Sequence, residues 1–181
     1  MLFPRLQLTI ATELIVIFIL ILANGVFAMS EIAVVAAKKV RLQQRAEDGD
    51  ERAKSALALA HDPNQFLATV QVGITMVGVL AGAYGGATLA EKLAVPIAQV
   101  AVLAPYAEII ALGLVVAVIT YLSLIIGELV PKRIGLNNPE AIASWVAGPM
   151  LALSRIGAPA VALLTASTNL VLRIFGIKGN A

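Results

Sequence analysis

Long apolar runs separated by short polar stretches set the pattern of this chain. Three of the runs are long enough for a helix that crosses a bilayer, which needs about 20 residues. The hydrophilic stretch at residues 38–64 is rich in alanine and leucine on both sides of Asp48-Gly49-Asp50, which predicts a hairpin of two short helices. The pattern indicates an all-α membrane protein. Its predicted spans are residues 8–37, 66–89 and 106–130.

The last apolar stretch, residues 139–175, allows two interpretations. It is apolar enough for a fourth span, but Pro149, Arg155, Gly157 and Pro159 interrupt its middle. Neither flanking half reaches a comfortable spanning length. The sequence therefore favours a kinked belt helix that lies at the cytoplasmic interface around the spans, with a fourth span as the alternative.

Composition and charge agree with a membrane protein and set its orientation. Hydrophobic residues make up 60% of the chain and charged residues 13%, about half the charged share of soluble domains. Six basic residues lie in the 38–64 segment and two more, Lys132 and Arg133, follow the third span. Only Lys92 lies between the second and third spans. The positive-inside rule therefore predicts an outside N-terminus, with the hairpin and the C-terminus cytoplasmic.

Several classes of function are disfavoured by residue types alone. The chain has no cysteine, which excludes disulfides and thiolate metal sites, and its single histidine excludes a multi-histidine site within one chain. A net charge of +2 without a basic stripe argues against nucleic acid as a partner. The lipid bilayer is the expected partner. The sequence contains neither H-E-x-x-H nor G-x-S-x-G, which disfavours an intramembrane enzyme.

The chemistry is concentrated around an acid at membrane depth. Glu128 closes the third apolar run, and a charge there is expensive unless a proton, a basic partner or a cation compensates it. Pro131 has no N–H, so the carbonyl of Gly127, four residues earlier, loses its helical partner. A free carbonyl beside a carboxylate is a pair of hard oxygen ligands, which predicts the binding of a hard cation.

Neutral oxygens on the other spans are spaced to join this acid. Asn24 and Ser30 lie in the inner half of the first span, Gln71 and Thr75 share a face of the second, and Ser123 shares a face of the third with Gly127. Neutral oxygens with one carboxylate suit Mg²⁺ or Na⁺, whereas Zn²⁺ usually takes histidine or cysteine.

Structural interpretations of the same residues stay open. Glu128 and Lys132, four apart, are spaced for an ordinary helix ion pair. Asn24 and Gln71 are also suited to join helices by hydrogen bonds, and serines and threonines in spans often bond back to their own helix. The glycines of the second span favour close helix packing.

Three ordered motifs resemble the transmembrane domain of the CorC / cyclin M (CNNM) family. They are residues 24–33 (NGVFAMSEIA), 66–75 (FLATVQVGIT) and 127–132 (GELVPK), and residues 82–86 (GAYGG) are typical of the bacterial CorC-like, formerly hemolysin-like, branch. The resemblance implies a homodimeric Mg²⁺ transporter of a bacterial inner membrane, with three spans and a belt helix. It also implies export driven by Na⁺ entry, a secondary-type transporter rather than an enzyme. The implied Mg²⁺ ligands are Glu128 first, then Asn24, Ser30, Gln71 and Thr75, with Ser123 and Gly127 as further candidates.

Two departures from the family pattern matter. Cyclin M-like members often carry asparagine where this chain has Ile74 or Gly78, which predicts a different set of ligands from the second span. Family members usually continue into paired cystathionine-β-synthase (CBS) modules that bind ATP. This sequence ends at Ala181, so residues 1–181 look like the single transmembrane domain without its ATP-binding modules. A membrane-embedded sensor or scaffold that binds Mg²⁺ without moving it requires the same residues and stays the alternative function.

Overall fold

A computed structural model describes residues 3–176, and within that range every regular element is helical. The prediction of an all-α membrane protein is confirmed, since four helical stretches are long and apolar enough to cross a membrane: Ile10–Ala36, Pro63–Ala98, Ala104–Asn137 and Pro139–Ile174. The elements are α1 (Phe3–Ala36), α2 (Lys39–Glu47), α3 (Glu51–His61), α4 (Pro63–Ala98), η1 (Ala104–Tyr106), α5 (Ala107–Leu124), η2 (Ile125–Leu129), α6 (Val130–Asn137) and α7 (Pro139–Ile174).

The chain divides into two compact units. Among the described residues, the first unit consists of residues 3–29 and 73–135, and the second of residues 30–72 and 136–176. The long helices α1 and α4 each contribute one part to either unit. The two units are described in turn.

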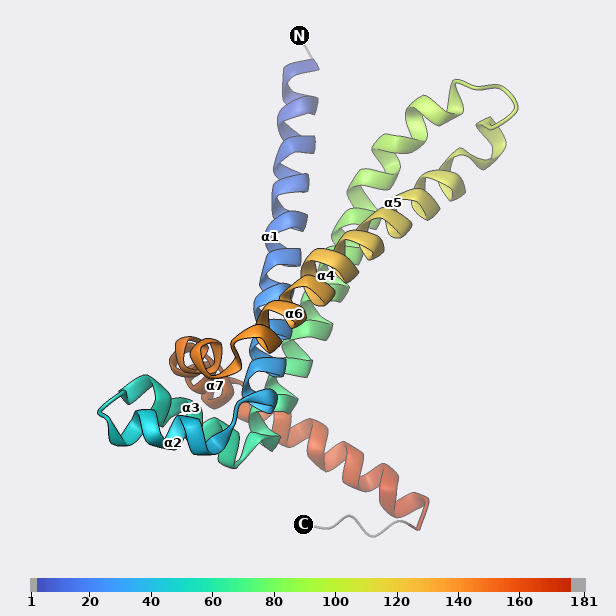
Figure 1. Ribbon diagram of the computed structural model, residues 1–181. Coiled ribbons are helices and arrows are strands. Elements are labelled where there is room, and N and C mark those ends of the chain that lie inside the picture. Colours follow the sequence, from blue (N-terminus) through green and yellow to red (C-terminus); the bar gives the residue numbers. More distant parts are fainter. Residues whose placement is uncertain (1–2, 177–181) are drawn as a thin grey trace. The chain divides into compact units, whose positions relative to one another are not determined.

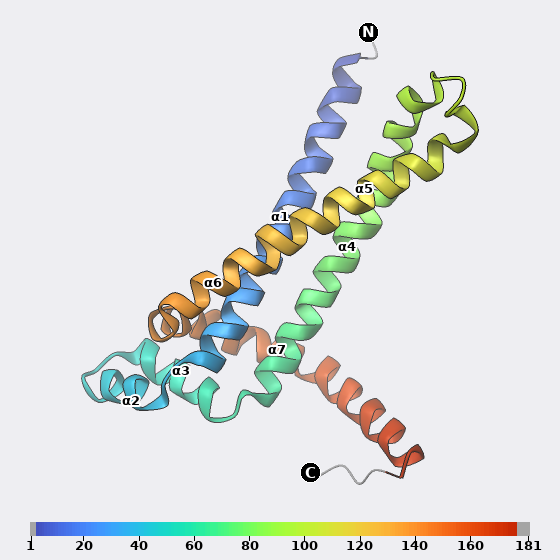
Figure 2. The same ribbon diagram turned by 45° about the vertical axis from the view of Figure 1, so that its right-hand side comes forward.

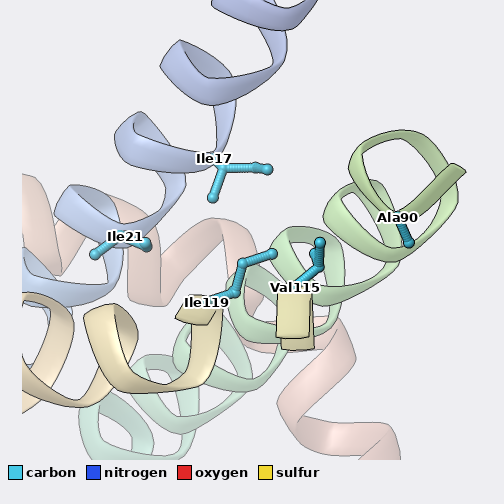
Figure 3. Close-up of a cluster of buried hydrophobic side chains, with 5 residues drawn as sticks. All are labelled: Ile17, Ile21, Ala90, Val115 and Ile119. Atoms are coloured by element: carbon cyan, nitrogen blue, oxygen red, sulfur yellow. The ribbon is translucent and has the colours of Figure 1, made fainter. Parts of the chain in front are cut away.

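The first unit is built on α1, α4 and α5. The last part of α4 and the start of α5 run antiparallel, side by side, in both views (Figures 1 and 2). Figure 3 shows the buried apolar cluster between these helices, made of Ile17 and Ile21 from α1, Ala90 from α4, and Val115 and Ile119 from α5. Burying these side chains against one another holds the three helices together by close packing.

Helix α4 extends beyond the predicted second span. The sequence assigned residues from Glu91 onward to an outer linker, but the helix continues to Ala98 and includes Pro96 near its end. Glu91-Lys92-Leu93-Ala94 are all strong helix formers, which explains the continuation. Because of this extension, Lys92 lies on the same helix as the glycines of the second span.

In the second unit, α2 and α3 form a hairpin that packs against α7 (Figures 1 and 2). Gly49 turns the chain with a positive φ of 94°, which glycine adopts without strain. Asp50 then caps α3 by accepting hydrogen bonds from the N–H groups of Arg52 and Ala53. The Ala53 N–H, followed by the Arg45 guanidinium and the Arg52 N–H, lowers the pKa of Asp50 from its ordinary value.

The start of α7 is tied to the hairpin by a buried acid. The Glu140 carboxylate accepts a hydrogen bond from the backbone N–H of Lys38, at the start of α2, and lies 3.8 Å from the guanidinium of Arg41. Pro149 and Pro159 lie inside α7 and each removes one helical hydrogen bond. Figure 1 shows the early turns of α7 nearly end-on and the last turns from the side, so the helix bends along its length.

Candidate cation site

The third apolar helix changes its winding next to the predicted acid. At Ile125, α5 gives way to one turn of π-helix, η2, in which the N–H of Val130 donates to the Ile125 carbonyl five residues earlier. Such single π turns are frequent at functional sites. The helix then passes through Pro131 in α6, and that proline has no N–H for the Gly127 carbonyl.

Asn24 of α1 binds the carbonyl that the proline leaves free. Its Nδ2 donates to the Gly127 carbonyl oxygen at 3.1 Å, and this hydrogen bond is buried. Two glycines allow the close approach of the helices. A Cβ on Gly127 would lie 3.1 Å from Asn24 Nδ2, and a Cβ on Gly25 would lie 2.9 Å from Pro131 Cγ. A carbonyl oxygen has two lone pairs, so the Gly127 oxygen keeps one for a further partner.

A cavity of about 200 Å³ opens beside this contact, between α1, α4 and the α5–η2 helix. Its lining combines an acid, an amide and two hydroxyls with the bare backbone of two glycines. Since a water takes about 30 Å³ in the liquid, the cavity has room for one cation together with several waters. The lining residues are Asn24, Gly78, Gly82, Val116, Ile119, Thr120, Ser123, Leu124 and Glu128.

Asn24 carries the clearest sign of a missing ligand. Its Nδ2 is satisfied by Gly127, but its Oδ1 is buried and has no hydrogen-bond partner. Leaving a buried amide oxygen unsatisfied costs about 1–3 kcal/mol. The residue lines the cavity, so a cation or a donor held there would remove that cost.

Glu128 lines the same cavity and is paired within its own helix. Its Oε1 accepts a hydrogen bond from Lys132 Nζ at 2.7 Å, and the two side chains are 39% and 34% exposed. The i,i+4 ion pair considered from the sequence is therefore present. It coexists with the buried hydrogen bond from Asn24 Nδ2 to the Gly127 carbonyl.

The structure brings some of the predicted ligands together. Asn24, Ser123 and Glu128 line the cavity, and Gly127 is bound to Asn24. Thr75 belongs to the same unit, but its side chain is exposed and it is not among the lining residues.

The remaining predicted ligands, Ser30 and Gln71, belong to the second unit, where Ser30 is buried and Gln71 is exposed. Within residues 3–176, no group of three or more His, Cys, Asp or Glu side chains is placed to hold a metal ion. A cation in the cavity therefore relies on neutral oxygens and one carboxylate.

A second ion pair in the first unit was missed by the sequence analysis. Lys92 Nζ of α4 donates to Glu13 Oε1 of α1 at 2.7 Å, and Glu13 is 8% exposed with its Oε2 buried and unpartnered. A signal was present in the sequence. Glu13 interrupts the apolar run of the predicted first span, and Lys92 is the single basic residue between the predicted second and third spans. Two opposite charges therefore stand near the ends of neighbouring predicted spans.

Comparison with known proteins identifies similar sequences over nearly the whole chain. The family described as "Cyclin M transmembrane N-terminal domain" matches residues 15–181. UPF0053 protein sll0260 of Synechocystis is 53% identical over 169 residues, which cover 93% of this chain and 38% of that protein.

Two similar proteins carry a functional name. Polyamine export proteins of Haemophilus influenzae and Escherichia coli are 32% and 30% identical, over 91% and 90% of this chain. The matched regions cover 38% and 36% of those two proteins, so this chain spans less than two fifths of the length of these relatives.

Proposed function

The chain belongs to the cyclin M family, as the match over residues 15–181 shows, and we propose that it transports Mg²⁺ across the membrane. It is a multi-pass membrane protein. The observation that carries the proposal is the buried, unpartnered Oδ1 of Asn24, a residue that lines a cavity together with Glu128. An amide oxygen and a carboxylate are the hard ligands that Mg²⁺ prefers.

The ligand set of the proposal combines protein oxygens with water. Asn24, Glu128, Ser123 and Thr120 line the cavity and carry an amide, a carboxylate and two hydroxyls, and the Gly127 carbonyl has a second lone pair. Mg²⁺ takes six oxygens and usually keeps some of its waters. The cavity volume of about 200 Å³ accommodates such a partly hydrated ion. Ser30, Gln71 and Thr75 stay predicted ligands on the strength of the resemblance.

In the membrane arrangement that we propose, α7 is a belt helix and not a fourth span. Helix α7 packs against α3, and its early residues Ser144 and Trp145 line a pocket with Arg52 of α3. Helix α3 belongs to the hydrophilic hairpin. Charged groups such as Arg52 and Lys54 on α3 are exposed, and they are strongly disfavoured in the hydrocarbon core. The part of α7 that packs on this hairpin therefore lies outside that core.

The remaining features of the proposal follow from charge and resemblance. The positive-inside rule orients the N-terminus outward, with the hairpin and the C-terminus in the cytoplasm. Resemblance to the bacterial branch supports a homodimer in the inner membrane that exports Mg²⁺ as a secondary-type transporter, with Na⁺ as the coupling ion. The homodimer and the coupling to Na⁺ can both be measured directly with purified protein.

A polyamine is the second candidate cargo. The Glu128 carboxylate already binds a primary alkylammonium in this structure, that of Lys132 at 2.7 Å, which is the chemistry by which a polyamine would be recognised. Two relatives are named polyamine export proteins. The chain also has Ile74 and Gly78 where cyclin M-like members often have an asparagine at one of the two positions.

The deciding experiment is a flux measurement on the protein reconstituted into sealed liposomes. Wild type is compared with Glu128→Gln, which keeps the size of the side chain and removes its charge. Glu108→Gln is the matched control, because Glu108 is an exposed acid in the first turn of α5 and does not line the cavity. We expect Mg²⁺ flux in wild type and in Glu108→Gln and none in Glu128→Gln, with all three equally folded by circular dichroism.

Other outcomes separate the alternatives. Wild-type flux in Glu128→Gln would show that this acid is not the cation ligand. Mg²⁺ binding by calorimetry without flux would identify a sensor or scaffold instead of a transporter. Flux of spermidine without flux of Mg²⁺ would identify the polyamine as the cargo.

A further inference from the structure

A polar pocket opens in the second unit, where the hairpin meets the belt helix. It has a volume of about 360 Å³ and lies between α3 and α7. Arg52 and Glu51 line it from α3, and Trp145, Gly148 and Pro149 line it from α7. All of its lining residues belong to the second unit. Since a water takes about 30 Å³ in the liquid, the pocket has room for a small polar group together with several waters.

Arg52 brings a positive charge to this pocket that the chain leaves unpaired. Its side chain is exposed, and within residues 3–176 its guanidinium takes part in no ion pair. Glu51, the acid of the pocket, is instead compensated by Lys54, whose ammonium lies 3.6 Å from the Glu51 carboxylate and does not line the pocket. The Arg52 guanidinium is therefore left for an external anion. A guanidinium binds phosphate oxygens through two parallel hydrogen bonds.

Two serines also line the pocket, but their hydroxyl protons are already engaged. Ser55 and Ser144 each donate to the carbonyl four residues earlier in their own helix, at 3.1 and 2.8 Å. The side-chain donors that remain for a ligand are the guanidinium of Arg52 and the indole N–H of Trp145. Two N–H donors, one of them positively charged, fit an anionic oxygen group rather than a cation.

The surface of α7 indicates which kind of anion reaches the pocket. Its exposed side chains are largely apolar, and Ile156, Leu163 and Ile174 are among the most exposed large hydrophobic residues of the chain. An exposed apolar helix face of this kind lies against lipid. Trp145 is 62% exposed, and tryptophan is enriched at the depth of the lipid headgroups. The pocket therefore lies where an apolar surface meets the charged surface of the hairpin.

We propose that this pocket binds the headgroup of an anionic phospholipid of the cytoplasmic leaflet. The Arg52 guanidinium and the Trp145 indole N–H donate to the phosphate, and the acyl chains continue along the apolar face of α7. Pro149 has no N–H for the Trp145 carbonyl, so this carbonyl can accept a hydrogen bond from a headgroup hydroxyl, such as those of phosphatidylglycerol. The bound lipid holds the hairpin and the belt helix together at the membrane surface. This inference rests on the proposed membrane arrangement of α7 and not on the identity of the cargo.

The test uses Trp145, which is the single tryptophan of the chain, so its fluorescence reports on this pocket alone. The protein is reconstituted into phosphatidylcholine liposomes that contain a minor fraction of phosphatidylglycerol. In one preparation the phosphatidylglycerol carries bromine atoms, which quench tryptophan, and in the other an equal amount of phosphatidylcholine carries them. We expect phosphatidylglycerol to associate with Trp145 about fivefold more strongly than phosphatidylcholine, as for one arginine near an anionic lipid.

Two variants and two matched controls locate the binding site. Arg52→Gln removes the charge, and Gly148→Leu places a side chain in the pocket without a clash, because a Cβ on Gly148 meets nothing within 4 Å. Both should abolish the preference for phosphatidylglycerol. Lys39→Gln makes the same change of charge at an exposed lysine of the hairpin that does not line the pocket. Gly113→Leu repeats the other substitution at an exposed glycine of α5 with open space around its Cβ. Both controls should keep the preference within about twofold of wild type.

Each other outcome contradicts the inference in a different way. Equal quenching by the two brominated lipids in wild type would overturn it. An equal loss of preference in Arg52→Gln and Lys39→Gln would do the same, because it would indicate diffuse surface charge instead of a pocket. Displacement of phosphatidylglycerol by an excess of inorganic phosphate would identify a soluble phosphate group as the ligand.

Quenching by neither lipid would overturn the membrane arrangement of α7 together with the lipid site. Mg²⁺ flux in liposomes is a separate measurement, so the transport proposal stands or fails independently.

Discussion

The hydrogen bond from Asn24 to Gly127 allows a quantitative test of why the site is built around a proline. In wild type, Pro131 has no N–H to donate to the Gly127 carbonyl, and Asn24 Nδ2 donates to that carbonyl at 3.1 Å instead. In Pro131→Ala, the new backbone N–H of residue 131 can donate to the Gly127 carbonyl, four residues earlier. Replacing Asn24 by leucine should therefore cost more in the wild-type background than in the Pro131→Ala background.

The expected magnitude follows from the burial of the contact. An unsatisfied buried carbonyl costs about 1–3 kcal/mol, and Asn24→Leu creates one only while Pro131 is present. Asn24→Leu also removes the unpartnered Oδ1, but that change is the same in both backgrounds and cancels in the double-mutant cycle. The cycle should therefore give a coupling energy of about 1–3 kcal/mol.

The assay is equilibrium unfolding in mixed micelles by titration with sodium dodecyl sulfate, without divalent cations, followed by circular dichroism. Pro96→Ala is the control background, because Pro96 is also inside a helix of the first unit but does not line the site. Asn24→Leu and Pro96→Ala should be additive within about 0.5 kcal/mol, as for independent sites. A coupling energy between Asn24 and Pro131 within the same limit of about 0.5 kcal/mol would refute the explanation that Asn24 replaces the backbone donor that Pro131 lacks.

Two further predictions concern packing and charge in the first unit. Gly25→Ala should lower stability by about 1–3 kcal/mol, because its Cβ would lie 2.9 Å from Pro131 Cγ and 3.0 Å from the Ile126 carbonyl oxygen. Gly78→Ala, whose Cβ meets nothing within 4 Å, should be neutral or stabilising by up to about 1 kcal/mol. Equal thermal unfolding temperatures for Gly25→Ala and Gly78→Ala would contradict the close contact of Gly25 with Pro131. Lys92→Met should cost about 3–5 kcal/mol because it leaves the buried Glu13 carboxylate uncompensated, and adding Glu13→Gln should restore most of the loss. A cost below about 1 kcal/mol for Lys92→Met, in the same micelle titration, would mean that the pair is open to water.

The two ion pairs show how differently local and distant partners can be predicted. Lys132 follows Glu128 by one helical turn, so their pairing was foreseeable as one of two interpretations. Glu13 and Lys92 are 79 residues apart, and Lys92 reaches Glu13 from a helix that was expected to end before it. That pairing depends on the length of α4 and on its packing against α1, neither of which the sequence pattern specified.

The sequence alone determined that the chain is an all-helical membrane protein of the cyclin M family, and that an acid and a proline lie together in its third apolar helix. Those properties follow from the hydrophobicity, the backbone hydrogen bonding and the motifs of residues that are neighbours along the chain. Only the tertiary structure decided that Asn24, 103 residues from Gly127, donates to the Gly127 carbonyl, keeps its own Oδ1 unsatisfied and lines one cavity with Glu128. The reason is that such contacts depend on where helices cross. Gly25 and Gly127 allow the helices to approach closely, but they do not determine which side chains come into contact there.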